Sequence, residues 1–153
     1  MGDHRYGEEA VNRAHGLICS SGWWAGTVEV VHGDATEMPF ADARFSGVVC
    51  FTMLHHLPST ESQDRLLSEV SRVLRAGGVF ACTDSLATGF VFRLLHVADT
   101  LVPVIPDELP ERVRRAGLIE PRVEESGRSF RFRAYKPVRP GEAPPQIVSN
   151  VVA

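Results

Sequence analysis

Two short and nearly continuous apolar runs, separated by an amphipathic helix, constrain the fold of this chain more than any other feature. The runs are Gly47 to Met53 and Val79 to Thr83. Strands that are buried on both faces of a parallel sheet have this appearance. A strand, a crossover helix and a second strand in this order predict an α/β sandwich built on a parallel sheet.

The helix between the two runs is predicted from the spacing of its apolar residues. These residues keep to one face of a helix; they are Leu66, Leu67, Val70, Val73 and Leu74. Thr60 followed by Gln63 fits a capping box at the start, and Gly77-Gly78 is expected to end the helix.

The flanking segments extend this pattern in both directions. Gly7 to about Ser20 has a helical stripe of apolar residues, and Thr27 to His32 reads as a β-branched strand. Leu86 to Ile105 is a long apolar segment, and we expect it to form a buried or amphipathic helix.

The last third of the sequence predicts a short helix and a hairpin. Asp107 is expected to cap the helix, with Pro110 in its first turn and Gly117 just past its end. Pro121–Glu125 and Ser129–Tyr135 then read as antiparallel strands, because apolar residues alternate strictly in the second run. Residues 1–136 are thus expected to form one domain, and the proline-rich residues 137–153 a flexible tail.

Composition and charge indicate a globular protein and disfavour polyanionic partners. The net charge of −3 gives no indication of a positively charged surface that would bind nucleic acid or an anionic membrane. The three cysteines are odd in number and form no C-x-x-C pair, so we expect reduced thiols and no metal site. The polar start of the chain predicts a cytoplasmic location.

The order of motifs from Val30 to Asp84 resembles that of class I S-adenosylmethionine-dependent methyltransferases, in particular small-molecule enzymes of the methyltransferase type 11 kind. The stretch from Val30 to Leu57 reads V-V-H-G-D-A-T-E-M-P-F-A-D-A-R-F-S-G-V-V-C-F-T-M-L-H-H-L. The family pattern there is G-D-A, P-F, an acidic residue, F-D-x-V and a strand ending in L-H-H. The continuation from Ser68 to Asp84 is similar to the family's helix and strand around L-K-P-G-G. The resemblance implies a Rossmann-like methyltransferase sandwich with S-adenosylmethionine as cofactor.

The same resemblance implies roles for residues after the first predicted strand. Gly33, Asp34 and Ala35 would meet the adenine, with the Asp34 carboxylate accepting from the exocyclic amine and the Ala35 N–H facing a ring nitrogen. One acceptor and one donor side by side suit an adenine edge. The alternative is that Asp34 only closes a turn, as aspartate often does.

The residues after the second predicted strand fall at the methionine end of the cofactor. Thr52 and Met53 would line that site with their backbone groups, although their side chains equally suit a core. His55 and His56 would lie at the mouth of the pocket, where an imidazole can take a proton from the methyl acceptor near neutral pH. The alternative is a helix-start or core histidine.

One expected part of the family pattern is missing. No two glycines are spaced G-x-G, and the sequence opens in what reads as the helix after the family's second strand. We therefore expect a fold that lacks the first two strands and exposes sheet edges to a homodimer or a protein partner. Two functions follow: transfer of a methyl group by direct displacement to a small-molecule acceptor, or a non-catalytic methyltransferase-like fragment that acts through a protein partner.

Overall fold

The computed structural model describes residues 31–86 and 102–138 of the chain. The chain divides into two units, residues 1–34 and 35–153, and all the helices and strands below belong to the second. The predicted helix Gly7–Ser20 lies outside the described residues, as do most of Leu86–Ile105 and of Thr27–His32. Val31 and His32, the last two residues of that predicted strand, have no regular structure.

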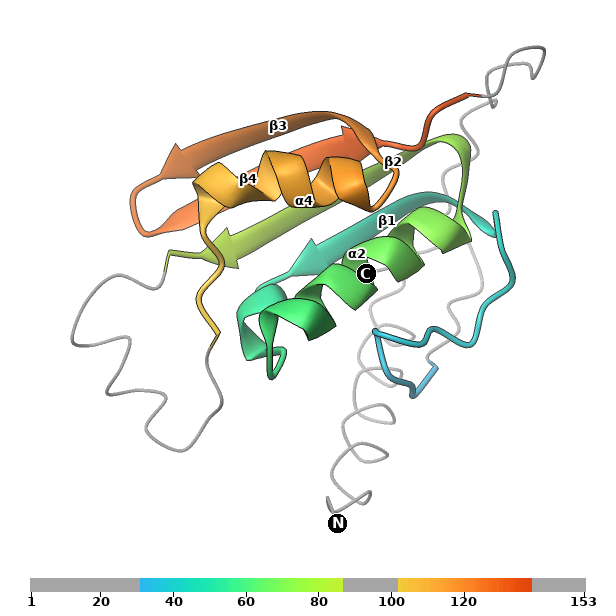
Figure 1. Ribbon diagram of the computed structural model, residues 1–153, viewed down its shortest axis with the longest axis horizontal. Coiled ribbons are helices and arrows are strands. Elements are labelled where there is room, and N and C mark those ends of the chain that lie inside the picture. Colours follow the sequence, from blue (N-terminus) through green and yellow to red (C-terminus); the bar gives the residue numbers. More distant parts are fainter. Residues whose placement is uncertain (1–30, 87–101, 139–153) are drawn as a thin grey trace, which may run out of the picture. The chain divides into compact units, whose positions relative to one another are not determined.

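The second unit is built on a four-stranded mixed sheet with the order β1-β2-β4-β3 (Figure 1). The strands are β1 (Phe45–Phe51), β2 (Leu74–Ser85), β3 (Ile119–Ser126) and β4 (Ser129–Tyr135). β1 and β2 are parallel, whereas β4 is antiparallel to both β2 and β3. The predicted α/β class, parallel core and terminal antiparallel hairpin are therefore confirmed.

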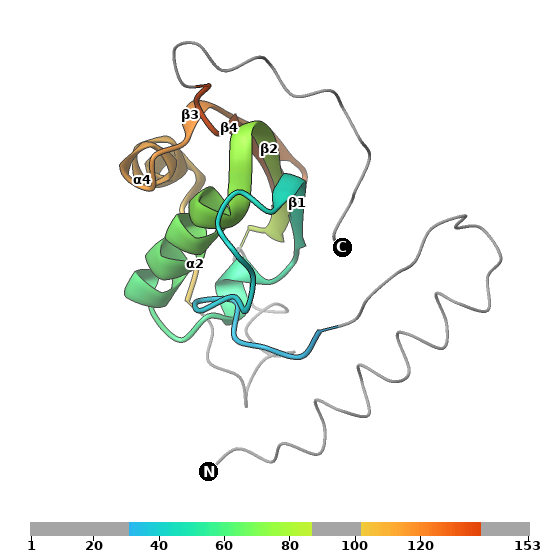
Figure 2. The ribbon, with the colours of Figure 1, turned by 90° about the vertical axis from the view of Figure 1, so that its right-hand side faces the viewer.

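Two helices cover one face of this sheet, α2 (Thr60–Val73) and α4 (Leu109–Arg115), as two perpendicular views show (Figures 1 and 2). Short 3₁₀ turns, η1 (Leu54–His56) and η2 (Pro106–Glu108), follow β1 and precede α4. The core lies between the helices and the sheet. The apolar stripe of α2 faces it, with Leu66, Leu67, Val70 and Val73 all at most 1% exposed.

The start of α2 differs from the predicted capping box. Ser59 is the N-cap, and its Oγ accepts a hydrogen bond of 3.1 Å from the Ser62 N–H. Gln63 does not reach back to the cap, because its side chain is buried and donates to the carbonyl oxygens of Leu54 and Val102.

The end of α2 also differs from the prediction. The helix ends at Val73, and Gly77-Gly78 lies inside β2. Leu74 pairs with Phe45, the register then shifts, and regular pairing resumes at Val79 opposite Gly47. Gly77 takes a φ of +71°, which suits glycine, so the pair makes an irregularity in the strand.

The C-terminal elements confirm most of what the sequence predicts. Pro110 is in the first turn of α4, and Gly117 follows the helix with a φ of +83°. Asp107 does not cap α4, because it lies within η2 and Glu108 occupies the N-cap position without a side-chain bond. In β4 the apolar residues Phe130, Phe132 and Ala134 are buried as predicted.

Candidate functional site

The carboxyl ends of the parallel strands β1 and β2 meet at one edge of the sheet, where α/β folds bind small ligands. β1 ends at Phe51, so Thr52 and Met53 follow the strand, and their predicted place within it is wrong. Thr52 has a φ of +48° and its N–H donates to the Thr83 carbonyl oxygen at 2.7 Å. This left-handed residue turns the chain off the sheet and into η1.

The two adjacent histidines of η1 lie in different surroundings. His55 is buried, with 3% of its surface exposed, whereas His56 is exposed. Their ring centroids are 4.1 Å apart. The structure therefore places both predicted histidines at the carboxyl edge, but His56 is the one at the protein surface.

His55 is paired with a buried carboxylate at the end of β2. Asp84, which has no exposed surface, accepts from His55 Nδ1, from the His55 backbone N–H at 3.2 Å and from the Ser85 N–H at 2.7 Å. A neutral imidazole that donates through Nδ1 has its acceptor at Nε2, so Asp84 selects the tautomer of His55. Sequence reasoning predicted Asp84 at the end of a strand but assigned it no role. The feature that could have indicated one is an acidic residue directly after an apolar run.

A second set of buried polar residues lies behind η1. Gln63 Nε2 donates to the Leu54 carbonyl oxygen at 3.1 Å and to that of Val102 at 3.0 Å. Gln63 Oε1 accepts from Arg112 Nη1 at 3.0 Å, and Arg112 Nε donates to Asp64 at 2.6 Å. Sequence reasoning missed Gln63 and Arg112 as partners, because they are 49 residues apart.

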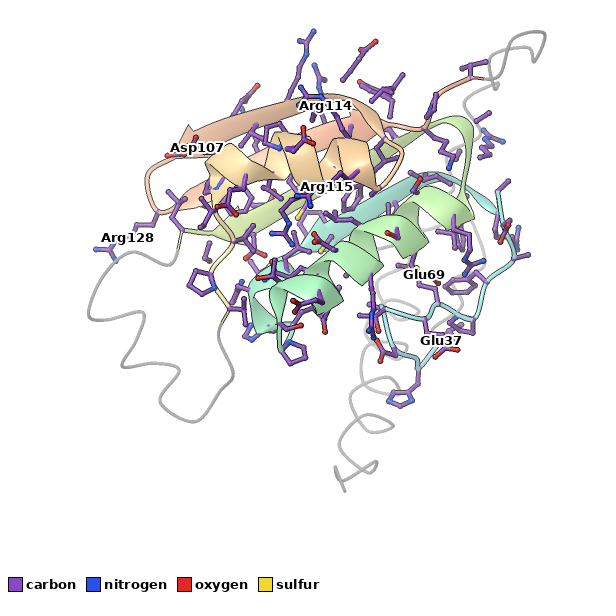
Figure 3. The ribbon with its side chains drawn as sticks, viewed as in Figure 1. Glu37, Glu69, Asp107, Arg114, Arg115 and Arg128 are labelled. Atoms are coloured by element: carbon purple, nitrogen blue, oxygen red, sulfur yellow. The ribbon has the colours of Figure 1, made fainter. Side chains whose placement is uncertain are left out.

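The loop before β1 is held by two charged residues of α2. Arg72 Nη1 donates to the Phe40 carbonyl oxygen at 2.7 Å, and Arg72 Nη2 to that of Met38 at 3.0 Å. Glu69 accepts from the Met38 N–H at 2.8 Å, and the hydrogen bond from Arg72 lowers the pKa of its carboxyl group. Figure 3 shows Glu69 on α2 beside this loop, which also carries Glu37. Ala35, at the start of the loop, packs against the core.

Gly33 and Asp34, the other two residues predicted to meet adenine, belong to the first unit and are exposed. Asp34 makes polar interactions of its own. Their adenine-binding role remains a prediction.

Cys50 and Cys82 pair across β1 and β2 and are buried free thiols. A hydrogen bond with Cys50 and burial raise the pKa of the Cys82 thiol, which disfavours the nucleophilic thiolate. Cys19 lies outside the described residues. In the part of the chain that the structure describes, no helix is long and apolar enough to span a membrane.

A mixed sheet in which β1 and β2 are parallel and are joined by a helix is a Rossmann-like α/β arrangement. A family model described as a methyltransferase domain matches residues 6–82, which is half of the chain. The chain therefore belongs to this methyltransferase family.

Curated relatives match a short central part of the chain. A fatty-acid O-methyltransferase of Mycolicibacterium smegmatis is 43% identical over 58 residues, which are 38% of this chain and 20% of the relative. A demethylmenaquinone methyltransferase of Listeria welshimeri is 40% identical over 58 residues, which are 38% of this chain and 23% of the relative. The chain thus spans about a fifth to a quarter of the length of these relatives.

Solved structures support the fold. A SAM-dependent methyltransferase of Methanosarcina mazei aligns with a TM-score of 0.68 at 18% identity, covering 86% of this chain and 79% of that one. A phosphoethanolamine N-methyltransferase of Haemonchus contortus, solved in complex with S-adenosyl-L-methionine, aligns with a TM-score of 0.59 at 16% identity, covering 68% and 36%. At these identities the likeness concerns the fold.

Proposed function

We propose that this chain contributes to the transfer of a methyl group from S-adenosylmethionine to a small-molecule acceptor in the cytoplasm. Its membership of the methyltransferase family carries this proposal. The names of two relatives, a fatty-acid and a demethylmenaquinone methyltransferase, favour a small organic acceptor. The net charge of −3 argues against nucleic acid as the substrate.

The residues at the carboxyl edge suit the proposed cofactor. Thr52 is exposed, and its left-handed backbone turns the chain away from the sheet. In this proposal the carbonyl groups of Thr52 and Met53 would be near the methionine portion of the bound cofactor. For the adenine the proposal keeps the sequence-based prediction, in which Gly33, Asp34 and Ala35 supply one carboxylate acceptor and one backbone donor. The cofactor would supply a methyl group on a positively charged sulfur.

Direct displacement needs the acceptor atom in line with the breaking S–CH3 bond, so positioning supplies much of the acceleration, about 7–11 kcal/mol at best. His56 is the better candidate for a base that takes the acceptor's proton, because it is exposed. His55 is buried against Asp84, so we propose that it supports the turn beneath His56 and acts on the substrate only through it.

A second candidate function is favoured by the face of the sheet that the helices leave uncovered. Phe51 is 62% exposed, and with Thr83, Arg131 and Arg133 it borders a shallow hollow of about 350 Å³. An exposed aromatic side chain beside arginines is typical of protein interfaces. A non-catalytic partner, or a homodimer, would use this face and the neighbouring edge of β1.

Isothermal titration calorimetry with S-adenosylmethionine tests the proposal. We expect saturable binding to the folded protein, weakened when Thr52 is replaced by proline, since proline cannot take a positive φ. Glu120→Pro, at an exposed residue of β3 that also has a positive φ of +53°, is the matched control. A folded sample that gives no heat at millimolar cofactor would favour the non-catalytic function.

A further inference from the structure

Two chain segments meet at the buried amide of Gln63, on the first turn of α2. One is η1, which carries His55 and His56, and the other is the chain as it returns at Val102 on its way to α4. The Gln63 side chain donates to a carbonyl oxygen of each segment. The Val102 N–H also donates to the His55 carbonyl oxygen at 3.0 Å, so the segments are joined directly as well.

The orientation of the Gln63 amide is set by Arg112. A guanidinium group only donates hydrogen bonds, so the amide oxygen must face Arg112, and the amide NH₂ must then face the two carbonyl oxygens. Both side chains are buried, with Gln63 1% and Arg112 5% exposed. A buried amide with all three contacts satisfied holds its neighbours firmly, because each alternative leaves a polar group unpaired.

Arg112 is held in turn by the start of α2. Its Nε donates to the Asp64 carboxylate at 2.6 Å and its Nη2 to the Thr60 carbonyl oxygen at 3.3 Å. The guanidinium thus joins α4 to α2. It cannot rotate without losing its hydrogen bonds to Gln63, Asp64 and Thr60. Arginine suits this place because its planar fork serves several acceptors at once.

We propose that Gln63 and Arg112 are positioning residues that join η1 and the chain at Val102 into one rigid unit at the carboxyl edge of the sheet. His55 extends this unit to β2 through Asp84. The consequence, which rests on the proposed function, is that the turn proposed to lie next to the cofactor and the chain at Val102 keep a fixed separation. Neither residue touches the reacting atoms.

Gln63→Glu is the sharpest test, because it keeps the shape and the contact with Arg112 but replaces the donating NH₂ by an acceptor. The readout is amide hydrogen exchange by NMR. We expect about tenfold faster exchange at Val102 and Leu57, whose N–H groups bond within this unit. The substitution removes the two hydrogen bonds to the Leu54 and Val102 carbonyl oxygens, which together are worth about 1.4 kcal/mol, a factor of ten. The amides of Phe132 and Ala134 in β4 should be unchanged.

Two further variants make the test robust. Arg112→Lys keeps the charge but loses the fork, and it should give the same local pattern if Gln63→Glu does not fold. Ser68→Ala, on the exposed face of α2, is the matched control. It should leave the exchange rates of the Val102 and Leu57 amides unchanged. Faster exchange spread evenly over all amides, or none at Val102, would overturn the proposal.

A titration with S-adenosylhomocysteine separates this proposal from the proposed function. We expect Gln63→Glu to bind it about tenfold more weakly than the wild type, the factor that corresponds to the two lost hydrogen bonds. Equal binding by both, with local exchange changed, would overturn the link to the cofactor. No binding by the folded wild type would instead count against the proposed function, while the exchange pattern would still decide whether Gln63 holds the two segments.

Discussion

Replacing Asp84 by asparagine is expected to lower the free energy of unfolding by about 1–3 kcal/mol, the usual cost of leaving a buried hydrogen-bonding group unpaired. Asp84 has no exposed surface and accepts three N–H groups, from His55 twice and from Ser85 once. An asparagine carries an NH₂ on one side of the group, which would face a donor and leave it unpaired. Urea denaturation followed by circular dichroism measures the loss.

Asp42→Asn is the matched control for this substitution. Asp42 is also paired with an arginine, Arg72 at 2.7 Å, but its side chain is 79% exposed. Exposed pairs contribute about 0–1 kcal/mol, so this variant should unfold close to the wild type. A similar small change for both variants would show that Asp84 does not stabilise η1 through its hydrogen bonds.

Replacing Gly78 by alanine is expected to cost about 3 kcal/mol of unfolding free energy, at the upper end of the usual cost of overpacking. A Cβ at this position would lie 2.9 Å from the Arg75 carbonyl oxygen and 3.1 Å from that of Ser46. Both are backbone atoms, so β1 and β2 would have to move apart. The midpoint of thermal or urea unfolding reports the change.

Gly47→Ala tests whether the effect comes from close approach. Gly47 lies on the neighbouring strand, and a Cβ there would meet a Val79 side-chain carbon at 3.5 Å, an ordinary contact. This variant should change stability by less than about 1 kcal/mol. An equal loss at both positions would mean that β-sheet glycines here matter for a reason other than space.

The fold follows from local patterns wherever one segment determines its own structure. The alternation of Phe130, Phe132 and Ala134 predicted β4 and its buried face, and the apolar stripe of α2 predicted the helix. The ends of these elements were less predictable, because they depend on neighbours. Ser59 and not Thr60 is the cap of α2, because the Gln63 side chain is buried in the core. Gly77-Gly78 lies inside β2, because Leu74 already pairs with Phe45.

The candidate site shows the same division. His55 and His56 were predicted just beyond the strand end and lie there, because sequence adjacency to a strand determines that position; Thr52 and Met53 were predicted inside the strand but follow it. The burial of one histidine and the exposure of the next could not be predicted, since it depends on Asp84, which is 29 residues away. The contact between Gln63 and Arg112 likewise joins two helices that are distant in sequence.

In the proposed function, the residues that follow β1 at the carboxyl edge of the parallel strands meet the methionine portion of the cofactor. NMR amide shifts recorded during titration with S-adenosylhomocysteine test it most directly. We expect saturable shifts at Thr52 and Met53, and no shifts at Gly77 and Lys136, which pair at the opposite edge of the sheet. Shifts confined to that opposite edge, or no saturable shift anywhere in the folded protein, would contradict it.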